Sequence, residues 1–177
     1  MRLRQNIVLT GFMGTGKSEV GKRLAARLEW TFIDTDMLIE RELGTSIAEL
    51  FTQKGEAYFR AHERRIIAQT CQQQDCVIAT GGGAIVDLVN AELLKKSGLV
   101  VCLTAPSEVI YNRVKGNANR PLLQGDKPLA KIRTLIADRA QAYARADVMV
   151  ETSQRSLDDV VHAVLAVYEK SKGDSSE

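Results

Sequence analysis

Eight consecutive residues, Gly11–Ser18 with the sequence GFMGTGKS, combine three glycines with a lysine and a hydroxyl side chain. Apolar residues 7–9 precede them, and a helical pattern of apolar residues begins at Val20. Glycines let backbone N–H groups turn inward around a polyphosphate, and the positive end of the following helix dipole faces the same phosphates. This order of strand, glycine-rich loop and helix predicts a phosphate-binding loop for a nucleoside triphosphate.

The lysine and serine of this loop have separate expected tasks. Lys17 reaches the β- and γ-phosphates, which makes it a candidate catalytic residue, and the hydroxyl of Ser18 binds Mg²⁺. The expected ATP contacts of this region are six consecutive residues: Gly14, Thr15, Gly16, Lys17, Ser18 and Glu19.

Two carboxylates, Asp34 and Asp36, follow the apolar residues 31–33. Ligands of a parallel sheet collect at the carboxyl ends of its strands, and alternate positions of an extended segment point the same way. Near Mg-ATP, one carboxylate can hold the metal's hydration shell while the other accepts a proton from an attacking hydroxyl. A helix begins just after this pair, so the alternative interpretation is that one of the two serves only as its N-cap.

A glycine triplet, Gly81–Gly83, follows the apolar residues 77–79. Bare backbone at a strand end brings N–H groups to a cleft, where they contact a substrate oxygen or the γ-phosphate. The competing interpretation is purely structural, because a tight turn from strand to helix also favours glycine.

Three arginines, Arg60, Arg120 and Arg139, are candidates for binding an anion. A planar guanidinium pairs bidentately with a carboxylate, although a surface arginine is usually only a solvated charge. Arg120 lies in residues 115–128, a segment rich in glycine, proline and charge that is long for an ordinary connection. We expect a mobile lid over about residues 113–127, the alternative being a plain surface loop.

The elements that must position these groups alternate along the chain. Strands are expected at residues 6–10, 31–33, 76–80, 98–103 and 147–150. Helices are expected at residues 16–28, 35–43, 46–53, 56–73, 87–97, 106–115, 128–145 and 156–170, two of them opened by the capping boxes Ser46 with Glu49 and Ser156 with Asp159. Continuous apolar strands indicate a sheet covered on both faces. The predicted fold is α/β, a doubly wound three-layer α/β/α arrangement with a five-stranded parallel sheet.

Length and composition limit the function classes. The chain has 177 residues, which favours a single domain (1–171), with a polar and disordered tail at 172–177. A net charge of +2 gives no electrostatic argument for nucleic acid, and no apolar run approaches the length of a membrane span. Three cysteines without ligand spacing, Cys71, Cys76 and Cys102, suggest reduced thiols in a cytoplasmic protein. The two histidines, His62 and His162, lack ligand-spaced partners, so we interpret both as structural.

Taken together, the motifs resemble the shikimate kinase family, a member of the nucleoside-monophosphate-kinase-like group of P-loop folds. The resemblance extends from about residue 6 to residue 165. It rests on motifs in the family's order and spacing: GFMGTGKS at 11–18, Asp34-Thr-Asp36, Phe59-Arg60 with Glu63, Gly81–Gly83, Asn119-Arg-Pro-Leu-Leu123, and Arg139 before Tyr143. The glycine triplet and the Asp-x-Asp pair discriminate, because many unrelated kinases share the phosphate-binding loop.

The resemblance implies transfer of the γ-phosphate of ATP to the 3-hydroxyl of shikimate, a step toward chorismate and the aromatic amino acids. It implies that Asp36 binds the acceptor hydroxyls and acts as base, and that Asp34 holds Mg²⁺ through water beside Ser18. Arg60 and Arg139 then bind the shikimate carboxylate, with the backbone of Gly81, Gly82 and Gly83 at its hydroxyls.

The resemblance further assigns Arg120 to the phosphoryl oxygens, as a catalytic and ATP-binding residue of the lid. Arg113 lies seven residues before it, at the spacing of a family arginine that stacks near adenine, and Arg155 is expected on the adenine's other side. Family members are often monomers.

Two other functions remain compatible with parts of this pattern. A kinase of the same fold acting on gluconate or a nucleoside monophosphate needs the same phosphate-binding loop, and gluconate also carries a carboxylate. A non-catalytic, nucleotide-dependent binding module needs the fold without the chemistry. The presence of Lys17, Asp36 and Arg120 argues against such a module.

Overall fold

Five parallel strands form the central sheet of the computed structural model, in which residues 6–116 and 125–173 are described. The strands are β1 (Asn6–Thr10), β2 (Thr31–Asp34), β3 (Cys76–Ala79), β4 (Gly98–Thr104) and β5 (Val148–Glu151). Their spatial order is β2-β3-β1-β4-β5, and every neighbouring pair is parallel. Each strand lies within one residue of its expected bounds, so the predicted sheet is confirmed.

The expected helices are present as α1 (Lys17–Leu28), α2 (Thr35–Leu43), α3 (Ile47–Lys54), α4 (Glu56–Thr70), α5 (Leu88–Ser97), α6 (Ser107–Val114), α7 (Pro128–Tyr143) and α8 (Leu157–Gly173). A short 3₁₀ turn, η1 (Ala84–Val86), was not expected. Helix α4 ends earlier than expected, and α8 continues further, through Gly173. None of the helices in the described ranges is long and apolar enough to cross a membrane.

Both expected capping boxes are present. The hydroxyl of Ser46 accepts from the Glu49 amide while the Glu49 carboxylate accepts from the Ser46 amide, at 3.2 Å each. Ser156 and Asp159 form the same reciprocal pair before α8. Each box satisfies backbone N–H groups that have no partner inside the helix, which explains where α3 and α8 begin.

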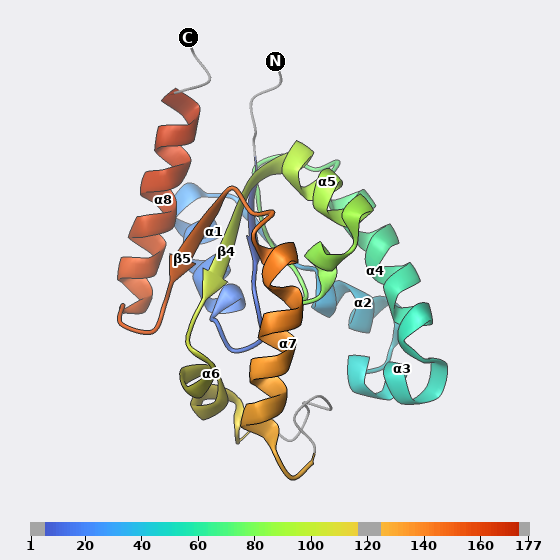
Figure 1. The fold of residues 1–177 in the computed structure, drawn as a ribbon. Coiled ribbons are helices and arrows are strands. Elements are labelled where there is room, and N and C mark those ends of the chain that lie inside the picture. The colour runs from blue at the N-terminus through green and yellow to red at the C-terminus, as the bar shows by residue number, and fades with distance from the viewer. Residues whose placement is uncertain (1–5, 117–124, 174–177) are drawn as a thin grey trace.

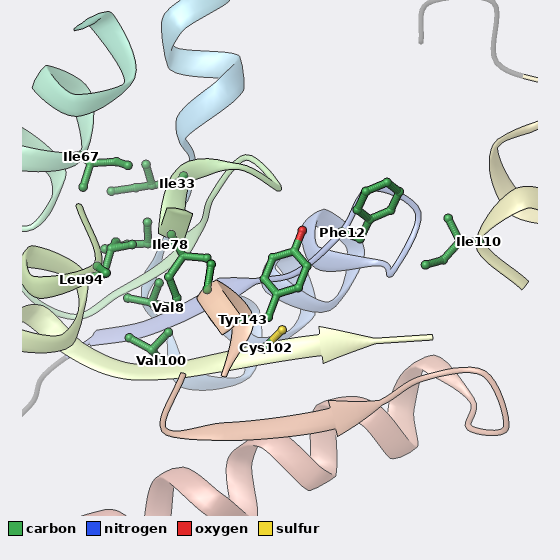
Figure 2. Close-up of a cluster of buried hydrophobic side chains, with 14 of the residues drawn as sticks. Val8, Phe12, Ile33, Ile67, Ile78, Leu94, Val100, Cys102, Ile110 and Tyr143 are labelled. Carbon is green, nitrogen blue, oxygen red and sulfur yellow. The ribbon is translucent and has the colours of Figure 1, made fainter. Parts of the chain in front are cut away.

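Helices cover both faces of the sheet, as Figure 1 shows. On one face, α1 and α8 bury Leu24 and Val164 against the side chains of Ile7 and Leu9. On the other face, Val8 packs with residues of α4, α5 and α7 (Figure 2). Alternate residues of β1 therefore enter opposite cores, which is why its sequence is apolar without alternation.

A third apolar cluster joins α2, α3 and α4 at one side of the molecule. Its buried members are Ile39, Leu50, Phe59 and Ile66. The cluster holds α2 and α4 together, and the N-terminal parts of these two helices carry Asp36 and Arg60.

The strand order brings the candidate residues together at one edge of the sheet. Strand β3 lies between β2 and β1, with Ala79 in register with both Asp34 and Leu9. The segments that follow these three strands carry the Asp-x-Asp pair, the glycine triplet and the phosphate-binding loop. Three motifs that are far apart in the sequence therefore emerge side by side at the carboxyl ends of adjacent strands.

Candidate active site

The phosphate-binding loop has the backbone conformation that its glycines permit. Gly14 and Gly16 have φ values of 75° and 94°, which side chains of L-residues rarely tolerate. Gly16 is also the N-cap residue of α1, so the positive end of this helix faces the loop. The Lys17 ammonium donates to the carbonyl oxygens of Gly11 and Phe12, at 2.8 and 3.0 Å. Its side chain therefore lies along the phosphate-binding loop.

Ser18 and Asp34, the two residues expected at the metal, are in contact with each other. The Ser18 hydroxyl donates to Oδ2 of Asp34 at 2.8 Å. The other oxygen, Oδ1, accepts from the backbone amides of Asp36 and Met37, so Asp34 is also the N-cap of α2. The N-cap interpretation and the metal interpretation are therefore compatible, because each uses a different carboxylate oxygen.

Asp36 occupies the first turn of α2, and its Oδ1 atom is buried without a hydrogen-bond partner. Burial, together with repulsion from Glu63 and Asp34, raises its pKa from 3.8 to about 7, against an opposing effect of Lys17. A carboxylate with a pKa near neutrality has the proton affinity that a general base needs.

The glycine triplet lies close to charged side chains, and two of its glycines leave no room for a Cβ atom unless those side chains shift. A Cβ atom on Gly81 would lie 2.7 Å from Oδ1 of Asp36, and one on Gly83 would lie 2.5 Å from a guanidinium nitrogen of Arg60. A Cβ atom on Gly82 would lie 3.2 Å from the Gly11 carbonyl oxygen and 3.5 Å from Arg139. Charged side chains and the phosphate-binding loop therefore meet at the triplet, beyond what a tight turn alone requires.

Arg60 is held by the buried carboxylate of Glu63. The sequence places Glu63 in the same motif as Arg60 but indicates no role for it. A guanidinium nitrogen of Arg60 lies 2.7 Å from Oε2 of Glu63, whose side chain is 1% exposed. Oε1 of Glu63 has no partner, and burial raises the pKa of Glu63 more than the Arg60 charge lowers it. The spacing of three residues on one helix was the available signal, because such residues lie on the same face.

Arg139 lies on α7 between the phosphate-binding loop and the triplet. Its guanidinium carbon is 5.7 Å from the centre of the Phe12 ring, within the range of a cation–π contact. Arg60 and Arg139 thus approach the triplet from two different helices, α4 and α7. Two separated cations around a bare backbone segment suit a small ligand that carries a negative charge.

The expected nucleotide arginines have different surroundings. Arg113, at the end of α6, donates to the Gly14 carbonyl oxygen and to the Thr152 hydroxyl, both at 3.1 Å. Its guanidinium therefore lies against the phosphate-binding loop, a contact that the sequence did not indicate. Arg155 is exposed after β5. Arg120 and the lid residues 117–124 lie outside the described residues.

The remaining expectations concern histidines and cysteines. The rings of His62 and Tyr58 are in tilted contact with centres 4.6 Å apart, and His162 contacts Arg27 at 2.7 Å, which supports structural tasks for both. The three cysteines are free thiols, and Cys76 and Cys102 are buried.

Two surface grooves, of about 410 and 500 Å³, lie beside α2, one lined by residues such as Arg41 and Gln69 and the other by residues such as Met37 and Glu49. Neither is lined by the loop or the triplet. The candidate site is therefore described by its converging charged groups.

Known proteins resemble this chain over nearly its whole length. The family model described as shikimate kinase matches residues 13–169. A shikimate kinase of Caldanaerobacter subterraneus subsp. tengcongensis is 41% identical over 96% of this chain and 99% of its own, and one of Geobacter sulfurreducens is 47% identical over 89% and 87%.

Among solved structures, the shikimate kinase from Acinetobacter baumannii in complex with shikimate has a TM-score of 0.91, with 38% identity and coverage of 95% of this chain and 94% of the other. A gluconokinase from Sinorhizobium meliloti matches with a TM-score of 0.62 at 16% identity, a likeness of fold alone.

Proposed function

The chain belongs to the shikimate kinase family, and we propose that it transfers the γ-phosphate of ATP to the 3-hydroxyl of shikimate, giving shikimate 3-phosphate and ADP. One observation carries this proposal. A Cβ atom built on one or another glycine of Gly81–Gly83 would lie within 3.5 Å of Asp36, Arg60, Arg139 and the phosphate-binding loop. A base, two carboxylate-binding cations and the phosphate donor's loop therefore surround one small volume.

Asp36 serves as the general base in this proposal. The acceptor hydroxyl lies beside its unpartnered oxygen, donates its proton there, and attacks the γ-phosphorus while the bond to ADP breaks. The pKa of about 7 means that a substantial fraction of Asp36 is ionised at neutral pH before substrate binds.

Arg60 and Arg139 orient the acceptor by pairing with its carboxylate. Gly81–Gly83 present backbone to its hydroxyls without side chains that would exclude it. Orientation matters here because phosphoryl transfer gives a protein little covalent chemistry to perform, so positioning and charge stabilisation supply most of the rate.

The ATP side of the site consists of six consecutive residues: Gly14, Thr15, Gly16, Lys17, Ser18 and Glu19. The backbone of the loop and the Lys17 ammonium bind the phosphates. To do so, Lys17 gives up its hydrogen bonds to the carbonyl oxygens of Gly11 and Phe12 and donates to phosphate oxygens. Arg113 and Arg155 flank the nucleotide's base. Arg120 contacts the transferred phosphoryl group when the lid, about residues 113–127 of a single kinase domain, closes.

Ser18 and Asp34 fit Mg²⁺, because both present oxygen atoms and those atoms lie 2.8 Å apart beside the loop. Ser18 would bind the ion directly and Asp34 through water. When bound, Mg²⁺ neutralises charge on the phosphate oxygens.

We also propose that the protein acts as a monomer in the cytoplasm. The buried free thiols of Cys76 and Cys102 suit a reducing compartment.

Release of ADP from Mg-ATP, measured with shikimate, gluconate or a nucleoside monophosphate as acceptor, tests the proposal. We expect strong release with shikimate and background release with the others. A preference for gluconate would keep the phosphoryl transfer and replace the substrate. Binding of ATP without any acceptor-dependent release would leave a nucleotide-controlled binding protein and refute the enzyme.

A further inference from the structure

The backbone that follows β3 is held by side chains from one end of α7 and the residues just beyond it. The hydroxyl of Tyr143, the last residue of α7, donates to the Gly82 carbonyl oxygen at 2.8 Å. Arg145, two residues later, donates to the carbonyl oxygens of Ile85 and Val86 at 2.8 and 3.0 Å. Carbonyl groups just before the η1 turn and within it are thus held by residues at one end of α7.

Fixing the Gly82 carbonyl also fixes a donor on the opposite side. The trans peptide unit between Gly82 and Gly83 is planar, so its N–H group points away from its C=O group. Because Tyr143 binds the C=O group, the Gly83 amide points away from α7. Gly83 is the residue that packs against Arg60. The hydroxyl of Tyr143 therefore sets the direction of an amide on the acceptor side of the triplet.

Tyr143 also reaches the second acceptor cation. It is 5% exposed and packs in the same apolar cluster as Phe12, next to which Figure 2 shows it. Burial raises the pKa of its hydroxyl, and the nearby Arg139 guanidinium opposes that rise. The phenol that binds the Gly82 carbonyl oxygen thus lies in the same cluster as Phe12, the ring over which the Arg139 guanidinium is placed.

We propose that Tyr143 and Arg145 are positioning residues that hold the Gly81–Gly83 backbone and Arg139 in the geometry that binds the acceptor. Neither residue needs to touch the substrate. Tyr143 holds the centre of the segment and Arg145 its far end, while the Thr80 amide holds its near end by donating to the Leu9 carbonyl oxygen at 3.0 Å. This inference rests on the proposed function, since it names what keeps that site in shape.

Tyr143→Phe tests the first contact, because it removes the hydroxyl and keeps the ring. We expect the KM for shikimate to rise about three- to tenfold, the range that one hydrogen bond accounts for. The KM for ATP and kcat should stay within about twofold, since the variant leaves the phosphate-binding loop intact. The matched control is Tyr168→Phe, which alters an equally buried tyrosine packed under α1 on the other face of the sheet.

Arg145→Met tests the second contact independently, and Arg145→Lys should restore part of the shikimate affinity because the ammonium again donates to a carbonyl. A purely structural effect would lower the melting temperature and alter both KM values together. Equal changes in the KM for ATP and for shikimate, or unchanged kinetics in both Tyr143→Phe and Arg145→Met, would overturn the proposal.

A readout that needs no substrate separates this proposal from the assigned reaction. The amides of Ala84 and Val86 donate to the Gly81 and Gly83 carbonyl oxygens, so their hydrogen exchange reports on the segment. Exchange there should be faster in Tyr143→Phe and Arg145→Met, and unchanged in Tyr168→Phe. If these amides exchange slowly in the wild type but the protein does not phosphorylate shikimate, only the assignment of shikimate as substrate is refuted. Unchanged exchange in both variants would refute the positioning.

Discussion

Asp36 and Glu63 direct one carboxylate oxygen each at the same side of Gly81. A Cβ atom on that glycine would lie 2.7 Å from Asp36 Oδ1 and 3.2 Å from Glu63 Oε1, and both oxygens are buried without a hydrogen-bond partner. Two carboxylates thus converge on a single point of bare backbone. Buried oxygens without a donor are costly, so a ligand that brought hydroxyl donors to this point would be bound favourably.

Gly81→Ala should therefore disable the acceptor site. Its methyl group would displace the Asp36 carboxylate, and we expect shikimate-dependent turnover to fall by roughly 100-fold, the effect of misplacing a catalytic group by about 1 Å. ATP binding should be retained, since the phosphate-binding loop is untouched. Gly173→Ala, which adds a methyl group in open space at the end of α8, is the control. Near-normal turnover in Gly81→Ala would remove Asp36 from its assigned task.

The two glutamates that contact Arg60 should differ in importance. Glu63 is buried at 2.7 Å, whereas Glu56 is 65% exposed at 3.4 Å. In Glu63→Gln the guanidinium loses its charged anchor and must be reordered on binding, so we expect the KM for shikimate to rise about tenfold. Glu56→Gln should change it less than about twofold, because exposed ion pairs contribute little. Steady-state kinetics measure the KM for shikimate of both variants. Equal changes in this KM would contradict the assignment of Glu63 as the main anchor of Arg60.

Much of this site follows from local patterns in the sequence. The phosphate-binding loop, the five strands and the positions of Asp34, Asp36 and Gly81–Gly83 were all read from apolar runs and the residues that end them. These features are predictable because a buried parallel strand is apolar throughout and its carboxyl end must carry the polar ligands.

Contacts between distant segments were not predictable in the same way. The signal for Glu63 was only its helical spacing from Arg60, and nothing local shows that it approaches Asp36. Tyr143 meets Gly82 across 61 residues of sequence, and Arg113 meets the Gly14 carbonyl across 99. Such pairs depend on how α4, α6 and α7 pack, which composition and periodicity do not determine.

Asp36→Asn should abolish phosphoryl transfer while ATP still binds, because an amide cannot accept the proton of the acceptor hydroxyl. Measurement of ADP release and of ATP binding separates the two effects. Turnover near that of the wild type would exclude Asp36 as the base.

The same substitution should stabilise the ligand-free protein at alkaline pH. The pKa of Asp36 is raised from 3.8 to about 7 on folding, so the folded state holds a proton that the unfolded state has released. The free energy of unfolding therefore falls as the pH rises between these two values. Asparagine does not titrate, so the variant does not lose this free energy of unfolding. The variant's free energy of unfolding should therefore exceed that of the wild type by an amount that grows from pH 5 and reaches about 1–3 kcal/mol at pH 8. Urea unfolding at both pH values measures it, and a constant difference would contradict the raised pKa.

Asp34→Asn should weaken metal binding without destabilising α2. The amide oxygen of asparagine still accepts from the Asp36 and Met37 amides, so the cap survives, but the negative charge beside Ser18 is lost. We expect the Mg²⁺ concentration for half-maximal rate to rise about 10- to 100-fold, as for other outer ligands of a metal.

The control for this metal dependence is Asp87→Ala, which removes an N-cap of the same kind. Asp87 accepts from the amides of Val89 and Asn90 at the start of α5. No hydrogen bond described for Asp87 involves the phosphate-binding loop. Losing that cap should cost about 1 kcal/mol of unfolding free energy and leave the Mg²⁺ dependence unchanged. If Asp34→Asn also left it unchanged, Asp34 would be only the cap of α2, and Ser18 would have to bind the ion without it.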